Sequence, residues 1–286
     1  MNVTTLTKRT SSVFYGYVIV AVAFLITAAT AGAIFSFGVF FAPLQAEFGW
    51  SRAVVSAAFS MHMLSQALLA VAVGRLNDRF GPRMILTVAG LLLGTGFMLI
   101  SRIDAVWQLY LLYGVLIGSG ITGGPVPLMS TVARWFHARR GMMTGIVMAG
   151  VGIGTMIMPP VADWMINTLG WRWSIRAVGL FLIATVPLMA QLLRRDPAQM
   201  RLLPFRSPAS PEQTSPGAFA AGIPFSQAIR TKQLWLLVIC FAAFGFGVHS
   251  IVVHVVVYGS GLGLSTSSAA GLMTATGASG MIGRIG

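Results

Sequence analysis

Long stretches without a charged residue constrain the fold of this chain more than any other feature. Seven stretches contain no Asp, Glu, Lys or Arg, and they cover residues 10–46, 53–74, 84–101, 105–133, 141–162, 177–193 and 233–283. A helix needs about 20 apolar residues to cross a bilayer, so the first six stretches predict one helix each. The seventh is about twice that length and holds a glycine-rich break at 259–263, after which Ser265 can act as an N-cap. We therefore predict an all-α membrane protein with about eight helices, at about 15–42, 52–74, 84–101, 107–133, 142–166, 173–193, 234–258 and 265–286.

Composition supports lipid as the surrounding solvent. Hydrophobic residues make up 56% of the chain and charged residues 9%, whereas a soluble domain carries about 25% charged residues. A net charge of +13 would suggest nucleic acid in a soluble protein, but here the charges form short clusters and no basic face, so no nucleic-acid partner is expected. The single cysteine, Cys240, excludes a disulfide framework. The dispersed histidines and unpaired carboxylates predict no catalytic residues, no metal and no cofactor.

The distribution of Lys and Arg predicts the orientation. Four of these residues (Arg52, Arg102, Arg172 and Arg176) precede or follow helices on one side. Fourteen fall on the other: Lys8, Arg9, Arg75, Arg79, Arg83, Arg134, Arg139, Arg140, Arg194, Arg195, Arg201, Arg206, Arg230 and Lys232. The positive-inside bias therefore predicts a multi-pass protein of the inner or plasma membrane with a cytoplasmic N-terminus. A cleaved signal peptide is the alternative for the start, but the apolar run after Arg9 is long for one.

A proline-rich segment divides the predicted helices into two groups. Residues 194–233 contain Pro197, Pro204, Pro208, Pro211, Pro216 and Pro224, a composition typical of an irregular linker. We therefore predict an N-terminal six-helix bundle at 1–193, a cytoplasmic central loop at 194–233 and the start of a C-terminal bundle at 234–286.

The segment between the second and third predicted helices carries a recognisable motif. It contains Gly74, Asp78, Arg79, Gly81 and Arg83. Gly74 permits close helix contact, Asp78 can pair with an arginine or cap a helix N-terminus, and Gly81 with the following proline makes a tight turn. The motif resembles the signature loop of the major facilitator superfamily, at the position that family requires. An ordinary basic turn is the alternative.

The fifth predicted helix also resembles that superfamily. It contains Gly150, Gly154 and the pair Pro159-Pro160. Small residues let helices approach closely and prolines bend them, so we expect packing and bending roles.

Further motifs are similar to the monocarboxylate transporter and oxalate–formate antiporter branch. They cover residues 37–41, 48–52, 134–141 and 170–172. Two features depart from related proteins. The first helix lacks the lysine of animal monocarboxylate transporters, and residues 105–133 lack the arginine of many proton-driven drug exporters, which makes drug export less favoured.

A short internal repeat predicts that the chain stops before the second copy of the signature loop. Residues 49–51 match residues 263–265 at an offset of 214, which puts the counterpart of Gly74 just past the last residue. The superfamily has about twelve helices, so we expect about four to be missing, whether the chain is a fragment or a natural short form.

The resemblance also suggests a substrate site. Gly283-Arg284-Ile285 resembles the eighth-helix arginine of this branch, which contacts substrate carboxylate, and Phe35 and Phe37 match its aromatic wall. A guanidinium can hold a carboxylate through two hydrogen bonds. The alternative is an Arg284 that reaches lipid headgroups at the membrane boundary. His249 is a weaker candidate for a residue that lines the substrate cavity. For His62 and His249, a cavity-lining or proton-accepting role is one interpretation, and a hydrogen bond to a neighbouring helix is the alternative.

These observations predict a secondary transporter for a small organic anion, working by alternating access in the lipid bilayer with a coupling proton or counter-anion. The alternatives are an exporter of a non-carboxylate compound and a non-transporting membrane sensor. A membrane enzyme is disfavoured by the lack of catalytic groups.

Overall fold

The computed structural model describes residues 14–136, 139–200, 225–261 and 279, and gives only the backbone at 198, 225–226 and 248–261. The chain divides into two units. The first comprises residues 1–206 and 281–286, and the second comprises residues 207–280. Each unit is described by itself.

Six apolar helical segments form the described part of the first unit. They cover Tyr15–Phe48, Arg52–Phe80, Pro82–Ile100, Val106–Trp135, Arg140–Leu169 and Trp171–Leu192, and each is long and apolar enough to cross a membrane. They comprise α1 (Tyr15–Phe35), η1 (Ser36–Phe40), α2 (Phe41–Phe48), α3 (Arg52–Phe80), α4 (Pro82–Ile100), α5 (Val106–Leu109), η2 (Tyr110–Ile117), α6 (Gly118–Thr122), α7 (Pro125–Trp135), α8 (Arg140–Leu169) and α9 (Trp171–Leu192). A short 3-10 helix, η3 (Pro197–Met200), follows α9 in the chain. With no strand among the described residues, the predicted all-α membrane fold is confirmed.

Glycines at positive φ separate consecutive helices. Gly49, Gly81 and Gly170 have φ of 67°, 82° and 81°, which L side chains rarely adopt. After Gly49, the Ser51 side chain accepts a hydrogen bond from the Val54 N–H and caps α3. The second helix ends at Phe80 rather than near residue 74 as predicted, because Gly74 is accommodated within the helix and only Gly81 turns the chain.

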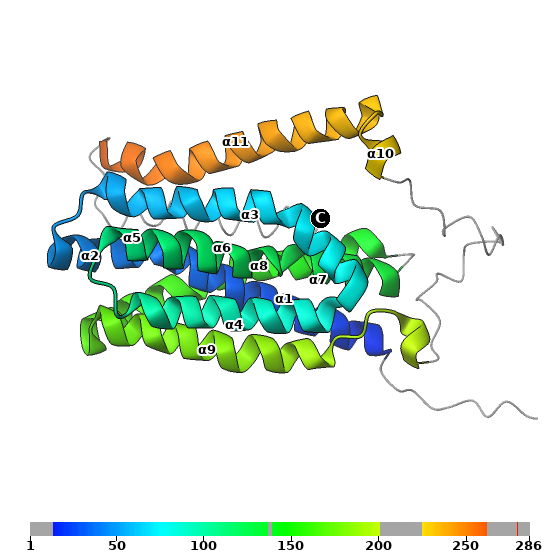
Figure 1. Cartoon of the computed structure of the whole chain (residues 1–286), viewed down its shortest axis with the longest axis horizontal. Coiled ribbons are helices and arrows are strands. Elements are labelled where there is room, and N and C mark those ends of the chain that lie inside the picture. The colour runs from blue at the N-terminus through cyan, green and yellow to red at the C-terminus, as the bar shows by residue number, and fades with distance from the viewer. Residues whose placement is uncertain (1–13, 137–138, 201–224, 262–278, 280–286) are drawn as a thin grey trace, which may run out of the picture. The chain divides into compact units, whose positions relative to one another are not determined.

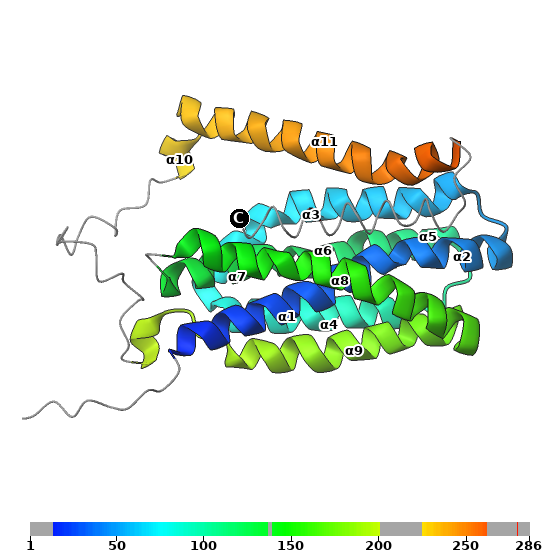
Figure 2. The ribbon, with the colours of Figure 1, turned by 180° about the vertical axis from the view of Figure 1, so that it is seen from behind.

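Two pairs of helices approach closely through glycine. Helices α1 and α8 run side by side, as do α4 and α9 (Figure 1, Figure 2). At the second crossing a Cβ on Gly94 would come within 2.6 Å of the Gly179 carbonyl oxygen, and the reverse holds for Gly179. Small residues therefore bring these backbones together, as is common in membrane bundles.

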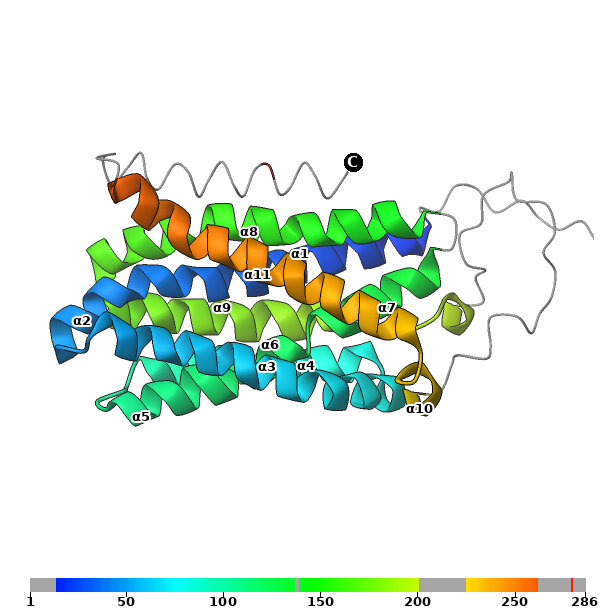
Figure 3. The same ribbon diagram turned by 90° about the horizontal axis from the view of Figure 1, so that it is seen from above.

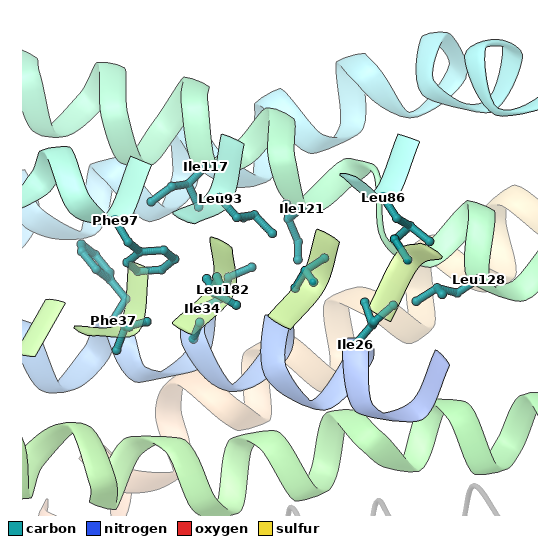
Figure 4. Close-up of a cluster of buried hydrophobic side chains, with 14 of the residues drawn as sticks. Ile26, Ile34, Phe37, Leu86, Leu93, Phe97, Ile117, Ile121, Leu128 and Leu182 are labelled. Atoms are coloured by element: carbon teal, nitrogen blue, oxygen red, sulfur yellow. The ribbon is translucent and has the colours of Figure 1, made fainter. Parts of the chain in front are cut away.

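Large apolar side chains from several helices fill the interior of the first unit. Figure 4 shows Ile26 and Ile34 of α1 together with Leu86 and Leu93 of α4 and Leu182 of α9. These side chains are buried in a core cluster that also includes Val55 of α3, Tyr113 of η2 and Val147 of α8, and dispersion contacts within it hold the six spans together.

One end of the first unit carries exposed tryptophans. Trp107, Trp164 and Trp173 lie near the start of α5, the end of α8 and the start of α9, and each is more than 60% exposed. The same end holds α2 and α5 (Figure 3). Exposed tryptophans are typical of the boundary between lipid and water, so this end lies at one membrane surface.

The second unit contains α10 (Phe225–Ala228) and α11 (Lys232–Gly261). Helix α11 has 30 residues and extends beyond the predicted 234–258 at both ends. The predicted helix at 265–286, with the exception of Ser279, lies outside the described residues.

Candidate functional site

The signature segment lies at the end of the bundle opposite to the exposed tryptophans, where α3 ends and α4 begins. Arg134 at the end of α7 lies between two carboxylates, with Nη2 3.7 Å from Asp78 Oδ1 and Nη1 3.5 Å from Asp196 Oδ1. Asp78 therefore pairs with an arginine of another helix, and the interaction joins α3 to α7 and to the chain beyond α9. The Arg134 and Asp196 side chains are about one-third exposed, and that of Asp78 is mostly exposed, so each ion pair contributes at most about 1 kcal/mol.

Three consecutive carbonyl groups at the end of α9 and just after it accept hydrogen bonds from side chains of three other helices. The Tyr15 hydroxyl donates to the Leu192 oxygen at 2.7 Å, Arg83 Nε donates to the Leu193 oxygen, and Trp135 Nε1 donates to the Arg194 oxygen at 2.9 Å. The last carbonyls of a helix lack intrahelical donors, and these three bonds satisfy them. They tie α1, α4 and α7 to the end of α9.

A second polar cluster closes the tryptophan-rich end. Glu47 of α2 accepts hydrogen bonds from Arg172 and, at 2.6 Å, from Trp171 Nε1. The Arg172 guanidinium also lies 4.5 Å from the Trp171 ring centroid and donates to the Ser101 carbonyl oxygen at 3.2 Å. Residues 48–52 and 170–172, which stood out as separate motifs in the sequence, thus meet here through Trp171 and the stacked rings of Phe48 and Trp50. Sequence reasoning missed Glu47, whose signal was a carboxylate beside an aromatic motif.

Glycines of α8 form the contact with α1. A Cβ on Gly150 would come within 2.6 Å of the Phe24 carbonyl oxygen, and one on Gly154 would overlap the Ala28 carbonyl. Pro159 and Pro160 lie inside α8, which continues through both to Leu169.

The two phenylalanines singled out on the first span have different surroundings. Phe35 is 41% exposed, whereas Phe37 is 1% exposed. The Phe37 ring stacks on Tyr113 with a centroid distance of 3.7 Å, and the Tyr113 hydroxyl donates to the Ile34 carbonyl oxygen at 3.3 Å. Phe37 is therefore a core residue in this conformation, and Phe35 has an accessible ring.

His62 of α3 lies beside this aromatic stack. Its ring centroid is 5.6 Å from those of Tyr113 and Phe59, and its side chain is 1% exposed. Neither ring nitrogen has a hydrogen-bond partner among the described residues, so none of them supplies the hydrogen bond to a neighbouring helix that was one alternative. Tyr113 lies in η2, a π-helical segment of a kind that frequently occurs at functional sites.

His249 lies in the backbone of α11, in the second unit, and Arg284 lies outside the described residues. Among the residues that the structure describes, no group of three or more His, Cys, Asp or Glu side chains could hold a metal ion.

Comparison with known proteins decides the family. The profile of the Major Facilitator Superfamily matches residues 23–286. The chain belongs to the major facilitator superfamily. The suspected family is thereby confirmed, and members of this superfamily are generally membrane transporters and not enzymes.

Several relatives carry names from the branch that the motifs indicated. Monocarboxylate transporter 13 of Bos taurus is 32% identical over 187 residues, which are 64% of this chain and 44% of that protein. The oxalate:formate antiporter of Oxalobacter formigenes is 29% identical over 261 residues, which are 90% of this chain and 57% of that protein. Monocarboxylate transporter 12 of Xenopus laevis is 26% identical over 95% of this chain and 61% of its own length. The chain thus spans about half the length of the curated relatives that it matches.

Proposed function

We propose that the protein carrying this chain transports a small mono- or dicarboxylate across the inner or plasma membrane by alternating access. The observation that carries the proposal is the similarity to proteins named as monocarboxylate transporters and an oxalate:formate antiporter, over 64–95% of this chain. Major facilitator architectures bind substrate near the membrane midplane between two repeats. In this proposal residues 1–193 form one repeat, residues 194–233 the cytoplasmic loop and residues 234–286 the start of the second repeat.

The proposed orientation follows from the charges at the two ends of the first unit. The end that holds the signature segment, called the signature end, carries Asp78 and Asp196. It also carries eight arginines: Arg75, Arg79, Arg83, Arg134, Arg139, Arg140, Arg194 and Arg195. The tryptophan-rich end carries four arginines and three carboxylates, Glu47, Asp104 and Asp163. Because cytoplasmic segments carry the excess of Lys and Arg, the signature end and the N-terminus face the cytoplasm in this proposal.

Arg284 is proposed as the group that binds the substrate carboxylate, with Phe35 as an aromatic contact. Arg284 is the only charged residue after Lys232, and no carboxylate lies in residues 233–286 to neutralise it. A buried guanidinium needs an anionic partner, and a carboxylate matches its geometry. Phe37, which stacks on Tyr113 in the core, supports Phe35 in the proposed aromatic wall of the substrate site. His249 is a further candidate for a residue that lines the substrate cavity. Exchange against a second anion or symport with a proton would complete the cycle.

The test is counterflow in proteoliposomes with the longest polypeptide that the gene encodes. Labelled oxalate, formate and lactate are compared with a neutral sugar and an organic cation as non-carboxylate substrates. We expect carboxylate exchange, loss of that exchange in Arg284→Gln and a smaller loss in Arg284→Lys, which keeps the charge. Arg102→Gln, an exposed position at the tryptophan-rich end, serves as the matched control. Full exchange by Arg284→Gln would assign Arg284 to the membrane boundary, and transport of only the sugar or the cation would reject a carboxylate substrate.

A further inference from the structure

A basic pocket lies outside the proposed substrate path, at the turn between α3 and α4. It has a volume of about 200 Å³ and is lined by Arg79, Phe80, Gly81, Pro82, Arg83, Arg195 and Gln199. A single water molecule needs roughly 10–15 Å³ of such space, so the pocket can hold a group much larger than water. Its three arginines and polar lining select for an anion.

Two of these arginines retain unused hydrogen-bonding capacity. Arg83 donates through Nε to the Leu193 carbonyl oxygen, but its Nη2 is buried and has no hydrogen-bond partner among the described residues. Arg79 makes no ion pair or hydrogen bond with the described residues, and its guanidinium lies 5.2 Å from the Phe80 ring centroid. A buried guanidinium nitrogen without an acceptor is costly, which indicates that an external acceptor completes this site.

The nearby carboxylates are already engaged elsewhere. Asp78 pairs with Arg134, and Asp196 pairs with Arg134 and, at 3.7 Å, with Arg195 Nε. Arg195 Nη1 donates to the backbone oxygen of Asp78 at 2.8 Å. The Asp196 side chain and the Asp78 backbone oxygen therefore position Arg195, and Arg79 and Arg83 are left to an incoming anion.

The start of α4 adds a further attraction for negative charge. Pro82 begins the helix, Gly81 precedes it at a φ of 82°, and no side chain caps the free N–H groups of the first turn. Helix N-termini bind phosphate groups because their N–H groups and dipole are directed at the ligand.

An exposed apolar stripe runs away from the pocket along two adjacent helices. On α4 the side chains of Met84, Val88 and Leu91 are exposed at helical spacing, and on α9 Leu188 and Leu192 are exposed as well. The stripe begins one residue after Arg83, and α4 packs along α9 (Figure 1). A ligand with a charged head and an apolar tail fits this combination, whereas free phosphate would use only the pocket.

We propose that the pocket at Arg79, Arg83 and Arg195 binds the phosphoryl headgroup of an anionic phospholipid whose acyl chains lie along α4 and α9. Basic pockets between helices on the cytoplasmic side are suited to such headgroups, and each Lys or Arg near the surface adds attraction. The site is independent of the transported substrate, and its cytoplasmic placement rests on the orientation proposed above.

The experiment is native mass spectrometry of the purified 286-residue chain, titrated with phosphatidylglycerol or with phosphatidylcholine that has the same acyl chains. We expect preferential retention of phosphatidylglycerol, and a reduction of about fivefold in its affinity in Arg79→Gln. Arg79 makes no polar contact within the described protein, so this variant should keep the thermal midpoint of the parent in the absence of lipid. The matched control is Arg75→Gln, which removes the same charge from an exposed position one turn earlier on α3.

The results of these titrations show what occupies the pocket. A loss in Arg79→Gln together with unchanged binding in Arg75→Gln supports the pocket. Equal losses in both variants would show diffuse attraction to the basic surface and overturn the proposal. A third arm adds millimolar inorganic phosphate, which should displace phosphatidylglycerol from the parent if both phosphoryl groups use the same arginines. Binding of phosphate without any preference for phosphatidylglycerol over phosphatidylcholine would overturn the lipid assignment and identify a soluble anion as the occupant.

Discussion

Gly154 of α8 lies so close to Ala28 of α1 that a Cβ at position 154 would overlap the Ala28 carbonyl group. Because the neighbouring atoms are backbone, they cannot move aside as the end of a flexible side chain can. The first and fifth spans are therefore in contact through their main chains, and the separation of these helices depends on the absence of a side chain at residue 154.

The first prediction concerns this contact. Gly154→Ala should lower the free energy of unfolding by about 1–3 kcal/mol, because overpacking forces the α1 and α8 backbones apart. Gly141→Ala in the same helix is the control, since a Cβ there meets nothing within 4 Å. Thermal unfolding in detergent measures both variants, and a Gly154→Ala protein as stable as Gly141→Ala would contradict the close crossing.

The second prediction concerns the ion pair between Glu47 and Arg172. A double-mutant cycle with Glu47→Gln and Arg172→Gln should give a coupling energy of about 0.2–1 kcal/mol, because both side chains are partly exposed. Added salt should reduce this coupling. The control cycle combines Arg172→Gln with Asp104→Asn, a carboxylate at the same end without an ion pair among the described residues. A coupling equal to that of the control would show that the two side chains act independently.

The third prediction separates stability from transport at Arg134. Arg134→Gln removes the contacts to Asp78 and Asp196 and should lower stability by at most about 1 kcal/mol, since these ion pairs are exposed. We expect a much larger loss of carboxylate exchange, because the two contacts join α3, α7 and the segment after α9 at the end that rearranges in the proposed alternating-access cycle. Arg75→Gln, without an ion pair among the described residues, should change neither quantity. Parallel losses of stability and exchange in Arg134→Gln would assign the residue a structural role alone.

The fourth prediction concerns the buried imidazole of His62. Replacing His62 by Phe should leave stability unchanged or raise it, because the substitution removes two buried nitrogens that have no described partner. Tyr113→Phe, by contrast, should cost about 0.5–1.5 kcal/mol, since it removes the hydrogen bond to the Ile34 carbonyl oxygen. Thermal midpoints compare the two variants, and a clear destabilisation by His62→Phe would indicate that the ring is satisfied by a bound water or ion.

The fifth prediction concerns the orientation of the spans. In a Cys240→Ala background, a cysteine at Arg75 should react with a membrane-impermeant maleimide only from the cytoplasmic side, and one at Arg102 only from the opposite side. The two positions are exposed and lie at the ends of consecutive spans. Labelling of both cysteines from one side would disprove the arrangement of spans two and three.

The sequence predicted the helical architecture more accurately than it predicted the contacts between residues. Uncharged stretches located all six spans of the first unit because lipid requires apolar length, a local property that composition records. The end of the second helix was placed nearly two turns too early, since Gly74 alone does not show whether a helix continues to Gly81. Family membership was also readable from short motifs, because the signature residues lie close together in the chain.

Tertiary structure alone decided which distant residues meet. Nothing in local sequence pairs Glu47 with Arg172, separates the exposed Phe35 from the buried Phe37, or leaves Arg83 Nη2 without an acceptor among the described residues. These relationships depend on helix rotation and on the separation of the α1–α8 and α4–α9 pairs, which glycine contacts set in three dimensions. The sequence by itself thus determined that the chain forms apolar helices in a membrane, because hydrophobic length and charge position act locally. The packing of those helices determined which described polar groups are paired and which lack a described partner, because those outcomes require several segments at once.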